Sequence, residues 1–289
     1  MSRLPGKILL ATDGSEDARL AARAAANLSD RAGAELHIVH AWQSVPHPVI
    51  DPDEYEEEAR RLLGVQTEFV SDAGGTVIEA HLVMGTPVDA ILDLGEEIGA
   101  DLVVVGSRGH GPLGRLILGS VSEGVVHHAT CPVLVLRGEQ DSWPPERVVI
   151  GDDGSEAAKK AGELASSIGD LFGARGVLVR AYLELPEVDP VGRTFDPRAV
   201  DDALHRAEQD LRERAEELGR LAGRRPRIEI AVGNAAVALL EKAREESRTL
   251  IAVGSRGPGL ARRLRLGSVS TKVLRAAEGP VLVYPHAET

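Results

Sequence analysis

One glycine pattern occurs twice in this chain of 289 residues, each time directly after a short apolar run. The first copy is Gly-Ser-Arg-Gly at 106–109, followed after nine residues by Gly-Ser at 119–120. The second copy has the same internal spacing and begins 148 residues later, at 254–257 and 267–268. A repeat of this length predicts a duplicated domain and not the short unit of a solenoid.

The duplication extends beyond the glycines. Residues 8–15, Ile-Leu-Leu-Ala-Thr-Asp-Gly-Ser, recur as Val-Val-Ile-Gly-Asp-Asp-Gly-Ser at 148–155, and a Pro-Val-Leu-Val sequence follows both Cys131 and Gly279. The offset is 140 at the front of the repeat and 148 at the back, so the second half has eight extra residues in its middle. We place them in the polar, proline-containing stretch 184–198. The predicted domains are 1–140 and 146–289, joined by a segment with Gly and paired Pro that reads as a linker.

Apolar runs and amphipathic segments alternate within each half. Strands are expected at 7–11, 35–41, 76–82, 101–105 and 133–136, and helices at 16–32, 53–73, 87–95 and 120–129, with Ser15 as the N-cap of the first helix. The second half follows the same order, with a long helix at 198–221. This pattern predicts an α/β fold of two tandem Rossmann-like domains, each a five-stranded parallel sheet with helices on both faces.

Composition narrows the function class. Aromatic residues make up only 3% of the chain, so Ala, Val and Leu supply the core, as suits thin α/β layers. Cys131 is the single cysteine, which excludes an intrachain disulfide. The net charge of −12 disfavours binding to nucleic acid or to an anionic membrane. With no signal peptide or membrane span in the sequence, a cytoplasmic protein is expected.

Special residues follow two strands that end at the same edge of each predicted sheet. In the first half these are Asp13, after the first strand, and the glycine loop, after the fourth. The loop leads directly into a helix, whose free N–H groups and positive dipole end favour an anion. Ser120 and Ser122 offer hydroxyl donors there, and the Asp13 carboxylate offers an acceptor to ribose hydroxyls or to a metal. The sequence therefore predicts a phosphate-binding loop in each half.

Asp-Gly-Ser after the first strand, the glycine motif after the fourth and Pro-Val-Leu-Val in the fifth together resemble the universal stress protein family in its tandem, two-domain form. The resemblance covers essentially the whole chain. It implies a strand order of 3-2-1-4-5 in each half, and it implies ATP binding, because members with this glycine motif typically bind ATP. We expect each half to bind one ATP with Mg²⁺. The resemblance does not identify a protein partner, an oligomeric state or a stress signal.

The resemblance also assigns site residues. The aspartate after the first strand falls on Asp13 and Asp153, and the adenine-contacting position falls on Val39 and Val179. The phosphate loop of the first half falls on Gly106, Arg108, Gly109, Gly119, Ser120, Val121 and Ser122. That of the second half falls on Gly254, Arg256, Gly257, Gly267, Ser268, Val269 and Ser270.

The second half departs from the pattern at two places. Gly85-Thr86-Pro87 becomes Gly-Asn-Ala at 233–235, without the proline, and the loop His-Gly-Pro-Leu-Gly-Arg at 110–115 becomes Pro-Gly-Leu-Ala-Arg-Arg at 258–263. The conformation of the second loop, and whether its site is intact, stay open at this stage.

Several candidate residues have ordinary structural alternatives. Ser120 and Glu123 form a capping-box pattern, so Ser120 can cap its own helix. Arg108 and Arg256 can clamp phosphates or remain solvated, and the same choice applies more weakly to Arg115, Arg262, Arg263 and Arg265. Cys131 reads as a small, buried or half-buried residue.

The histidines do not predict a metal site. His37 and His40 lie three apart along a strand and so fall on opposite faces, and the adjacent His127 and His128 point to different sides of a helix. Whether the chain holds any other metal is not decided by the sequence.

No catalytic constellation is present: the Walker, nucleophile-elbow and zinc-protease motifs are all absent. The favoured function is therefore ATP binding coupled to stress response or dormancy, and slow ATP hydrolysis is compatible with it. The alternatives are an interaction scaffold with purely structural glycine loops and a true ATP hydrolase. In the family that the chain resembles, single-domain members pair as dimers through their final strands. The corresponding strands here, 133–136 and 281–284, are apolar and β-branched, so we expect them to pair antiparallel within one chain as an intrachain pseudo-dimer, and either half alone to self-associate.

Overall fold

The computed structural model describes residues 4–44, 52–109, 118–139, 141–182, 197–255 and 266–286. The elements of the first half are β1 (Lys7–Ala11), α1 (Glu16–Ala32), β2 (Glu35–Trp42), α2 (Pro52–Asp72), β3 (Val77–Met84), α3 (Pro87–Ile98), β4 (Leu102–Gly106), α4 (Ser120–His128) and β5 (Val133–Leu136). Those of the second are β6 (Arg147–Gly151), α5 (Glu156–Phe172), β7 (Arg175–Tyr182), α6 (Pro197–Leu221), β8 (Arg227–Val232), α7 (Ala235–Arg244), β9 (Thr249–Gly254), α8 (Ser268–Ala276) and β10 (Val281–Tyr284). The predicted α/β alternation is confirmed in both halves.

Helix ends follow local chemistry. Ser15 caps α1 as predicted, because its side chain accepts a hydrogen bond from the Ala18 N–H. The largest boundary error lies in α3, which was expected to end at Gly95 and continues to Ile98. Gly95 lies inside the helix, whereas Gly99 ends it in the left-handed conformation, with φ of 66°.

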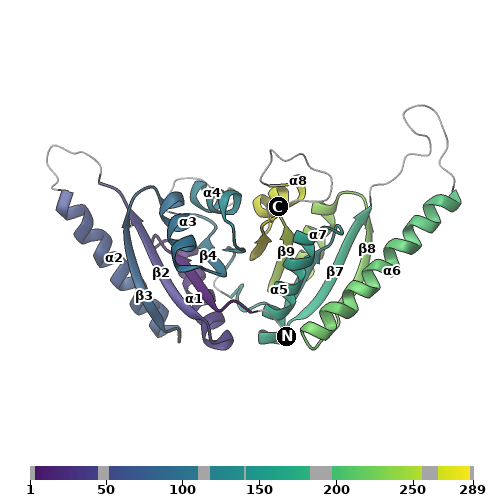
Figure 1. Cartoon of the computed structure of the whole chain (residues 1–289), viewed down its shortest axis with the longest axis horizontal. Helices are drawn as coiled ribbons and strands as arrows, with labels where there is room; N and C mark the ends of the chain where they lie inside the picture. The colour runs from purple at the N-terminus through teal and green to yellow at the C-terminus, as the bar shows by residue number, and fades with distance from the viewer. Residues whose placement is uncertain are drawn as a thin grey trace, which may run out of the picture.

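The strands form one continuous sheet of ten strands, in the order β3-β2-β1-β4-β5-β10-β9-β6-β7-β8. Each half therefore has the 3-2-1-4-5 order, and all neighbours within a half are parallel. At the centre β5 and β10 pair antiparallel, with Leu134 opposite Leu282. The two halves thus form an intrachain pseudo-dimer around an approximate two-fold axis, visible as two similar wings in Figure 1.

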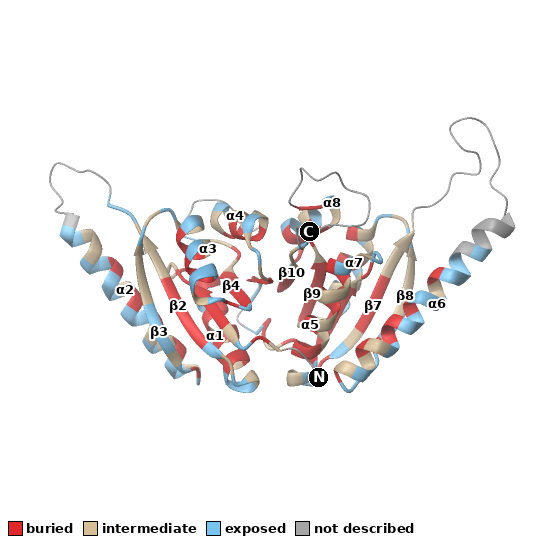
Figure 2. Cartoon of the chain, in the orientation of Figure 1, coloured by how far each residue is buried: buried red, intermediate tan, exposed pale blue. Residues whose placement is uncertain are grey.

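Helices cover both faces of the sheet. One apolar cluster joins the sheet to α1, α2, α5 and α6, and the other joins it to α3, α4, α7 and α8. Burial is concentrated in the central strands and in the helix faces against them, while the outer sides of α2 and α6 are exposed (Figure 2). Cys131, packed against the second cluster, is half-buried as predicted, and burial raises the pKa of its thiol to about 11.

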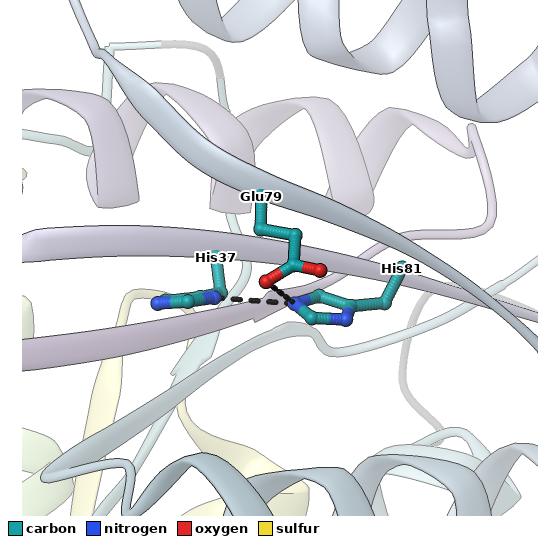
Figure 3. Close-up of side chains that lie close together, drawn as sticks. All are labelled: His37, Glu79 and His81. Carbon is teal, nitrogen blue, oxygen red and sulfur yellow. Dashed lines mark hydrogen bonds and ion pairs between the residues drawn. The ribbon is translucent and has the colours of Figure 1, made fainter.

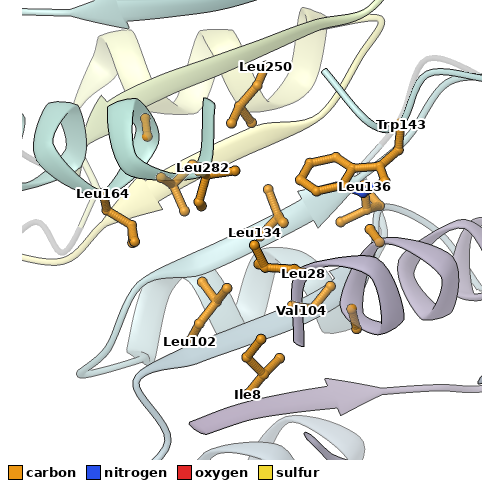
Figure 4. Packing of buried hydrophobic residues seen from close by; sticks show 14 of the residues in the cluster. Ile8, Leu28, Leu102, Val104, Leu134, Leu136, Trp143, Leu164, Leu250 and Leu282 are labelled. Atoms are coloured by element: carbon orange, nitrogen blue, oxygen red, sulfur yellow. The ribbon is translucent and has the colours of Figure 1, made fainter. Parts of the chain in front are cut away.

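The centre of the molecule is packed continuously across the two halves. Leu134, Leu136, Leu164 and Leu282 belong to one cluster together with Trp143 from the segment between the domains (Figure 4). The Trp143 ring meets Phe172 of α5 edge-on, with centroids 5.4 Å apart. The segment expected to be a linker is therefore partly buried and belongs to the core.

The placement of the eight extra residues concerns 184–198. The structure describes only the end of this stretch, where α6 begins at Pro197, and the rest lies outside the described residues.

Candidate functional site

Each half has a cleft where the carboxyl ends of its strands meet, which is the usual place for a ligand in an open parallel sheet. The cleft of the first half has a volume of about 320 Å³ and that of the second about 230 Å³. The first value lies at the lower end of the range of about 300–1,000 Å³ that small-molecule sites occupy. Each cleft is lined by residues of its own half alone.

The two clefts correspond residue by residue. The second is lined by 14 residues, and every one of them is the repeat counterpart of one of the 16 that line the first. The two first-half residues without a counterpart are Arg108 and Gly109, because Arg256 and Gly257 lie outside the described residues. Duplication has therefore kept a whole cavity and not only a short motif.

The sequence-predicted site residues gather in these clefts. The first contains Asp13, Val39, Gly106, Arg108, Gly109, Gly119, Ser120, Val121 and Ser122. The second contains Asp153, Val179, Gly254, Gly267, Ser268, Val269 and Ser270. The candidate arginines Arg115, Arg262, Arg263 and Arg265 lie outside the described residues.

The turn after β1 holds the aspartate at the mouth of the first cleft. Gly14 adopts φ of 80°, a left-handed conformation that favours glycine, and the Ser15 N–H donates to Asp13 Oδ1 at 3.0 Å. Gly154, Ser155 and Asp153 repeat this turn, with a corresponding distance of 2.9 Å. Both carboxylates are thereby held beside the glycine loops.

The glycine loop is closed at its neck by two hydrogen bonds to a single carbonyl. The Ser107 carbonyl accepts from the Gly119 N–H and from the Ser122 hydroxyl, both at 2.8 Å. The second half has the same arrangement, with Ser255 accepting from Gly267 at 2.6 Å and from Ser270 at 3.0 Å. The start of each following helix is therefore fixed against the end of the preceding strand.

This neck corrects two expectations about the serines. Ser120 does not cap α4, because Gly119 is the N-cap residue and no side chain caps the helix. Ser122 is buried and directs its hydroxyl to the Ser107 and Gly119 carbonyls, so that hydroxyl is not a free donor toward the cleft. The first-turn N–H groups of α4, with the exposed Ser120 beside them, supply the donors to the cleft.

Gly106 has a structural reason of its own. A Cβ on this residue would lie 2.6 Å from the Asp17 carbonyl carbon and 2.7 Å from the Ala18 nitrogen. Gly254 meets the Ala158 nitrogen at 2.7 Å in the same way. Besides lining the clefts, these two glycines therefore permit the start of the first helix of each half to pack closely on the strand. Gly109 differs, since its Cβ would meet the Asp13 carboxylate.

Arg108 turns back into the protein. Its Nε and Nη2 donate to the two carboxylate oxygens of Asp17, at 3.1 and 3.3 Å. Asp17 also accepts from the Ser107 hydroxyl at 2.6 Å and is buried. The Arg108 guanidinium is thus paired with Asp17 and not simply solvated, while the residue also lines the cleft. Its counterpart Arg256 lies outside the described residues. The second half has Ala157 at the position of Asp17, so it has no carboxylate there.

The two halves differ in charge beside the clefts, at Thr12 and Asp152, which line them, and at the partners of these two residues, which do not. In the first, the Thr12 hydroxyl donates to Gln66 and the Thr12 carbonyl accepts from His40. In the second, Asp152 and Arg180 occupy the positions of Thr12 and His40, and Arg180 Nη2 donates to Asp152 Oδ1 at 2.7 Å. Burial acts to lower the pKa of Arg180, but the bond and charge of Asp152 outweigh it and raise that pKa.

Sequence reasoning missed most of the apolar wall. Val39 was predicted, but Ala41, Pro87, Ile91 and Val105 also line the first cleft. They come from the ends of β2 and β4 and from the first turns of α3. Same-face alternation along β2 would have found Ala41, whereas the α3 residues depend on how that helix packs across the sheet.

The arrangement suits an anionic ligand with an apolar part. Apolar side chains of β2, β4 and α3 form one wall, and the uncapped amides of α4 with Ser120 form the other. Asp13 adds an acceptor for hydroxyl groups or a ligand for a cation. Neither described lining holds a lysine, histidine or cysteine, and the carboxylates are those of Asp13 in the first cleft and of Asp152 and Asp153 in the second.

Comparison with known proteins agrees with this duplication. A model described as the universal stress protein family matches residues 5–137 and again residues 145–285. Among the described residues, no helix is both long and apolar enough to cross a membrane.

Relatives of the same length and of half the length are both found. A universal stress protein of Mycobacterium tuberculosis is 31% identical over 266 residues, which cover 86% of this chain and 85% of the relative. One from Thermus aquaticus is 43% identical over 136 residues, or 45% of this chain and 97% of the relative. The crystal structure of a universal stress protein from Archaeoglobus fulgidus matches 98% of this chain, with a TM-score of 0.71 and 25% identity.

Proposed function

The chain belongs to the universal stress protein family, and from that premise we propose that each of its two clefts binds one ATP molecule together with Mg²⁺. The observation that carries this proposal is the residue-by-residue correspondence of the two cavities. A structural glycine turn would require only the neck and the tight strand packing to recur. Here the apolar wall, the aspartate and the exposed helix-start serine recur with them.

Each part of the nucleotide has a matching part of the cleft. The uncapped amides at the start of α4 and α8 suit the phosphates, because helix N-termini present free N–H groups and a positive dipole end to an anion. Val39 and Val179, each buried at the cleft floor, suit the adenine. Asp13 and Asp153 remain for the ribose hydroxyls or for the cation.

Mg²⁺ fits the donors that are present. It prefers oxygen ligands and is usually held by one or two carboxylates together with substrate phosphates. Asp13 and Asp153 would hold it in their respective clefts. The ion supplies charge neutralisation, which matters because the chain has a net charge of −12 and the described lining of each cleft contains no lysine.

Binding, and not rapid turnover, is the activity that these clefts support. The described linings contain no second carboxylate or histidine placed to activate a water molecule in the first half, and in the second half Asp152 is paired with Arg180. We therefore propose that nucleotide occupancy is the signal, coupled to the stress response that the family name denotes. This physiological part rests on family membership alone.

Titration calorimetry with ATP and Mg²⁺ tests the proposal. Two sites per chain are expected, and the signal should be lost when adenosine, the nucleoside without phosphates, replaces ATP. A stoichiometry of one would show that only one cleft is competent, and no binding would refute the proposal. Native mass spectrometry of the same sample then separates binding from hydrolysis: retained ATP agrees with a sensor, and ADP accumulating on added ATP identifies a hydrolase.

A further inference from the structure

Two histidines and a glutamate that do not line the cleft meet at the outer edge of the first half. His37 lies on β2, and Glu79 and His81 lie on the edge strand β3 (Figure 3). One ligand atom from each of the three falls within 4.8 Å of the others. The sequence comparison of His37 with His40 was right that they lie apart, but it overlooked His81. The expectation that histidines make no metal site was formed without this cluster.

A local irregularity aligns these residues. Along β2 and β3, Leu36 pairs with Val77 but His37 pairs with Glu79, so one extra residue, Ile78, is inserted in β3. Bulges of this kind re-aim the side chains that follow them. Beyond the bulge the register is regular, so His37 and Glu79 are opposite each other and His81 follows two residues later on the same face.

The separations suit a shared metal ion. His37 Nδ1 lies 3.1 Å from His81 Nε2, and the same His81 nitrogen lies 3.8 Å from Glu79 Oε2. Tetrahedral Zn²⁺ with bonds of about 2.0–2.1 Å places its ligand atoms roughly 3.3 Å apart. Without a metal, one ring nitrogen donates its proton to the other, and a cation between the rings would take the place of that proton.

The surroundings of His37 favour ligation through Nδ1. The ring is buried, and its Nε2 has no hydrogen-bond partner among the described residues. Glu35 Oε2 lies 3.9 Å from this nitrogen, and Glu35 is itself paired with Lys7 at 3.3 Å. A carboxylate facing the outer N–H of a ligating histidine is the usual second layer of a metal site.

We propose that His37 Nδ1, His81 Nε2 and Glu79 bind one divalent first-row transition cation of the Zn²⁺ type at the edge of the first domain. Two imidazoles and one carboxylate select such ions over Mg²⁺ and Ca²⁺, which prefer oxygen ligands. Glu79 is exposed and His81 is half-buried, so the cation is reached from solvent and water completes its coordination. The proposal is independent of nucleotide binding.

The second half provides an internal comparison. Its residues at the positions of His37, Glu79 and His81 are Val177, Arg227 and Glu229, in a ladder where Val179 pairs with Glu229 as Val39 pairs with His81. Glu229 is bound instead by Lys242 of α7, at 2.6 Å. A cation site in the first half is therefore matched by a fixed ammonium group in the second, and only one metal per chain is expected.

Calorimetric titration of the metal-stripped, nucleotide-free full chain with Zn²⁺ tests this assignment. We expect one site per chain, and an unfolding temperature that rises with Zn²⁺ concentration because the ion binds the folded state. Millimolar Mg²⁺ should not compete. Co²⁺ in the same site should give the visible absorption of a tetrahedral complex.

Two variants assign the ligands. His81→Gln should weaken Zn²⁺ binding at least ~100-fold and Glu79→Gln about tenfold, since each keeps the size of the side chain but removes a ligand. Glu79 is exposed, so its variant is expected to fold normally. The control is the double variant His127→Gln with His128→Gln, which removes two histidines outside the cluster and should bind as the unmodified chain does. The absence of a stoichiometric Zn²⁺ site, or an affinity unchanged in both cluster variants, would overturn the proposal.

Discussion

The two halves of the molecule are alike in the residues that line the clefts and different in the polar residues at the outer edges of the sheet. Every described lining residue of the second cleft has its counterpart in the first, and the loop necks use the same hydrogen bonds. At the edge, His37, Glu79 and His81 of the first half are replaced by a ladder in which Lys242 binds Glu229. The duplicated chain has thus kept one kind of site twice and built a different polar cluster at each edge.

The two halves also differ in charge beside the clefts. Thr12 and His40 in the first half correspond to the ion pair of Asp152 and Arg180 in the second. The clefts therefore share their donors but differ in charge and in volume, about 320 against 230 Å³. We therefore predict that both clefts bind the same kind of ligand, with different affinities.

The largest expected effect concerns the joint between the halves. Leu134 and Leu282 face each other across β5 and β10 and are both fully buried. Leu134→Ala and Leu282→Ala should each lower the free energy of unfolding by about 2–5 kcal/mol, since each leaves a cavity in the shared core. Because the core is continuous, denaturant unfolding should remain one transition. Two separate transitions, only one of them shifted, would show that the halves fold independently.

The next effect separates the two nucleotide sites. Ser120→Asp places a carboxylate in the first turn of α4, where it suits the helix but repels a triphosphate. We expect roughly 100-fold weaker ATP binding at the first site, equal to ~2.7 kcal/mol, while the second site is unchanged. Ser268→Asp should do the reverse.

The matched controls are Ser120→Asn and Ser268→Asn, which keep the size without the charge and should change affinity by no more than a few-fold. Calorimetry distinguishes the sites by stoichiometry, falling from two to one in each Asp variant. Undiminished ATP binding in both Asp variants would show that the phosphates do not bind at the N-termini of α4 and α8.

A smaller effect tests the necks of the loops. Ser122 and Ser270 are buried, and each donates to two backbone carbonyls. Replacing either by Ala should cost about 1 kcal/mol of stability, the usual net value of one such hydrogen bond. Thermal unfolding should show similar losses for the two variants. Clearly unequal losses would mean that the necks, although alike in geometry, differ in energy.

The smallest effect concerns the ion pair of Asp152 and Arg180 beside the second cleft. Asp152→Thr combined with Arg180→His gives the second half the residues of the first at these two positions. Because it removes the Asp152 carboxylate from the cleft lining, it should raise ATP affinity at the second site by a few-fold, within ~1 kcal/mol. The reciprocal pair, Thr12→Asp with His40→Arg, should lower affinity at the first site. Site-resolved titration in the Ser120→Asp or Ser268→Asp background measures each separately. If the two sites still differ in ATP affinity after both exchanges, the difference in affinity comes from the cleft volumes and not from these charges.

Much of this architecture follows from the sequence because it depends on local periodicity. Apolar runs such as that of β4, and the Ser15 cap of α1, are set within a few residues, so their places were predicted closely. The antiparallel joint of β5 and β10 was also predicted, from the resemblance to a family whose single-domain members pair through their final strands and from the apolar character of those strands here. Only α3 was misjudged by more than two residues, because a glycine inside it was read as its end.

The side chains of the site were harder to predict because their roles depend on contacts far away in the sequence. Arg108 is directed by Asp17, 91 residues earlier, and Ser122 by the Ser107 carbonyl across the loop. His37 lies close to His81 because a bulge in β3 shifts the strand register, and no sequence pattern predicted that bulge. Motif spacing therefore located the clefts correctly but did not say which of their polar groups are already bound by the protein.

The most direct measurement is a crystal structure of the full chain with ATP and Mg²⁺. The account predicts a nucleotide in each half, with its phosphates at the N-terminal amides of α4 and α8 and its adenine against Val39 and Val179. Nucleotide bound elsewhere, or clefts left empty at saturating ATP, would contradict the claim that the duplication preserves two nucleotide sites.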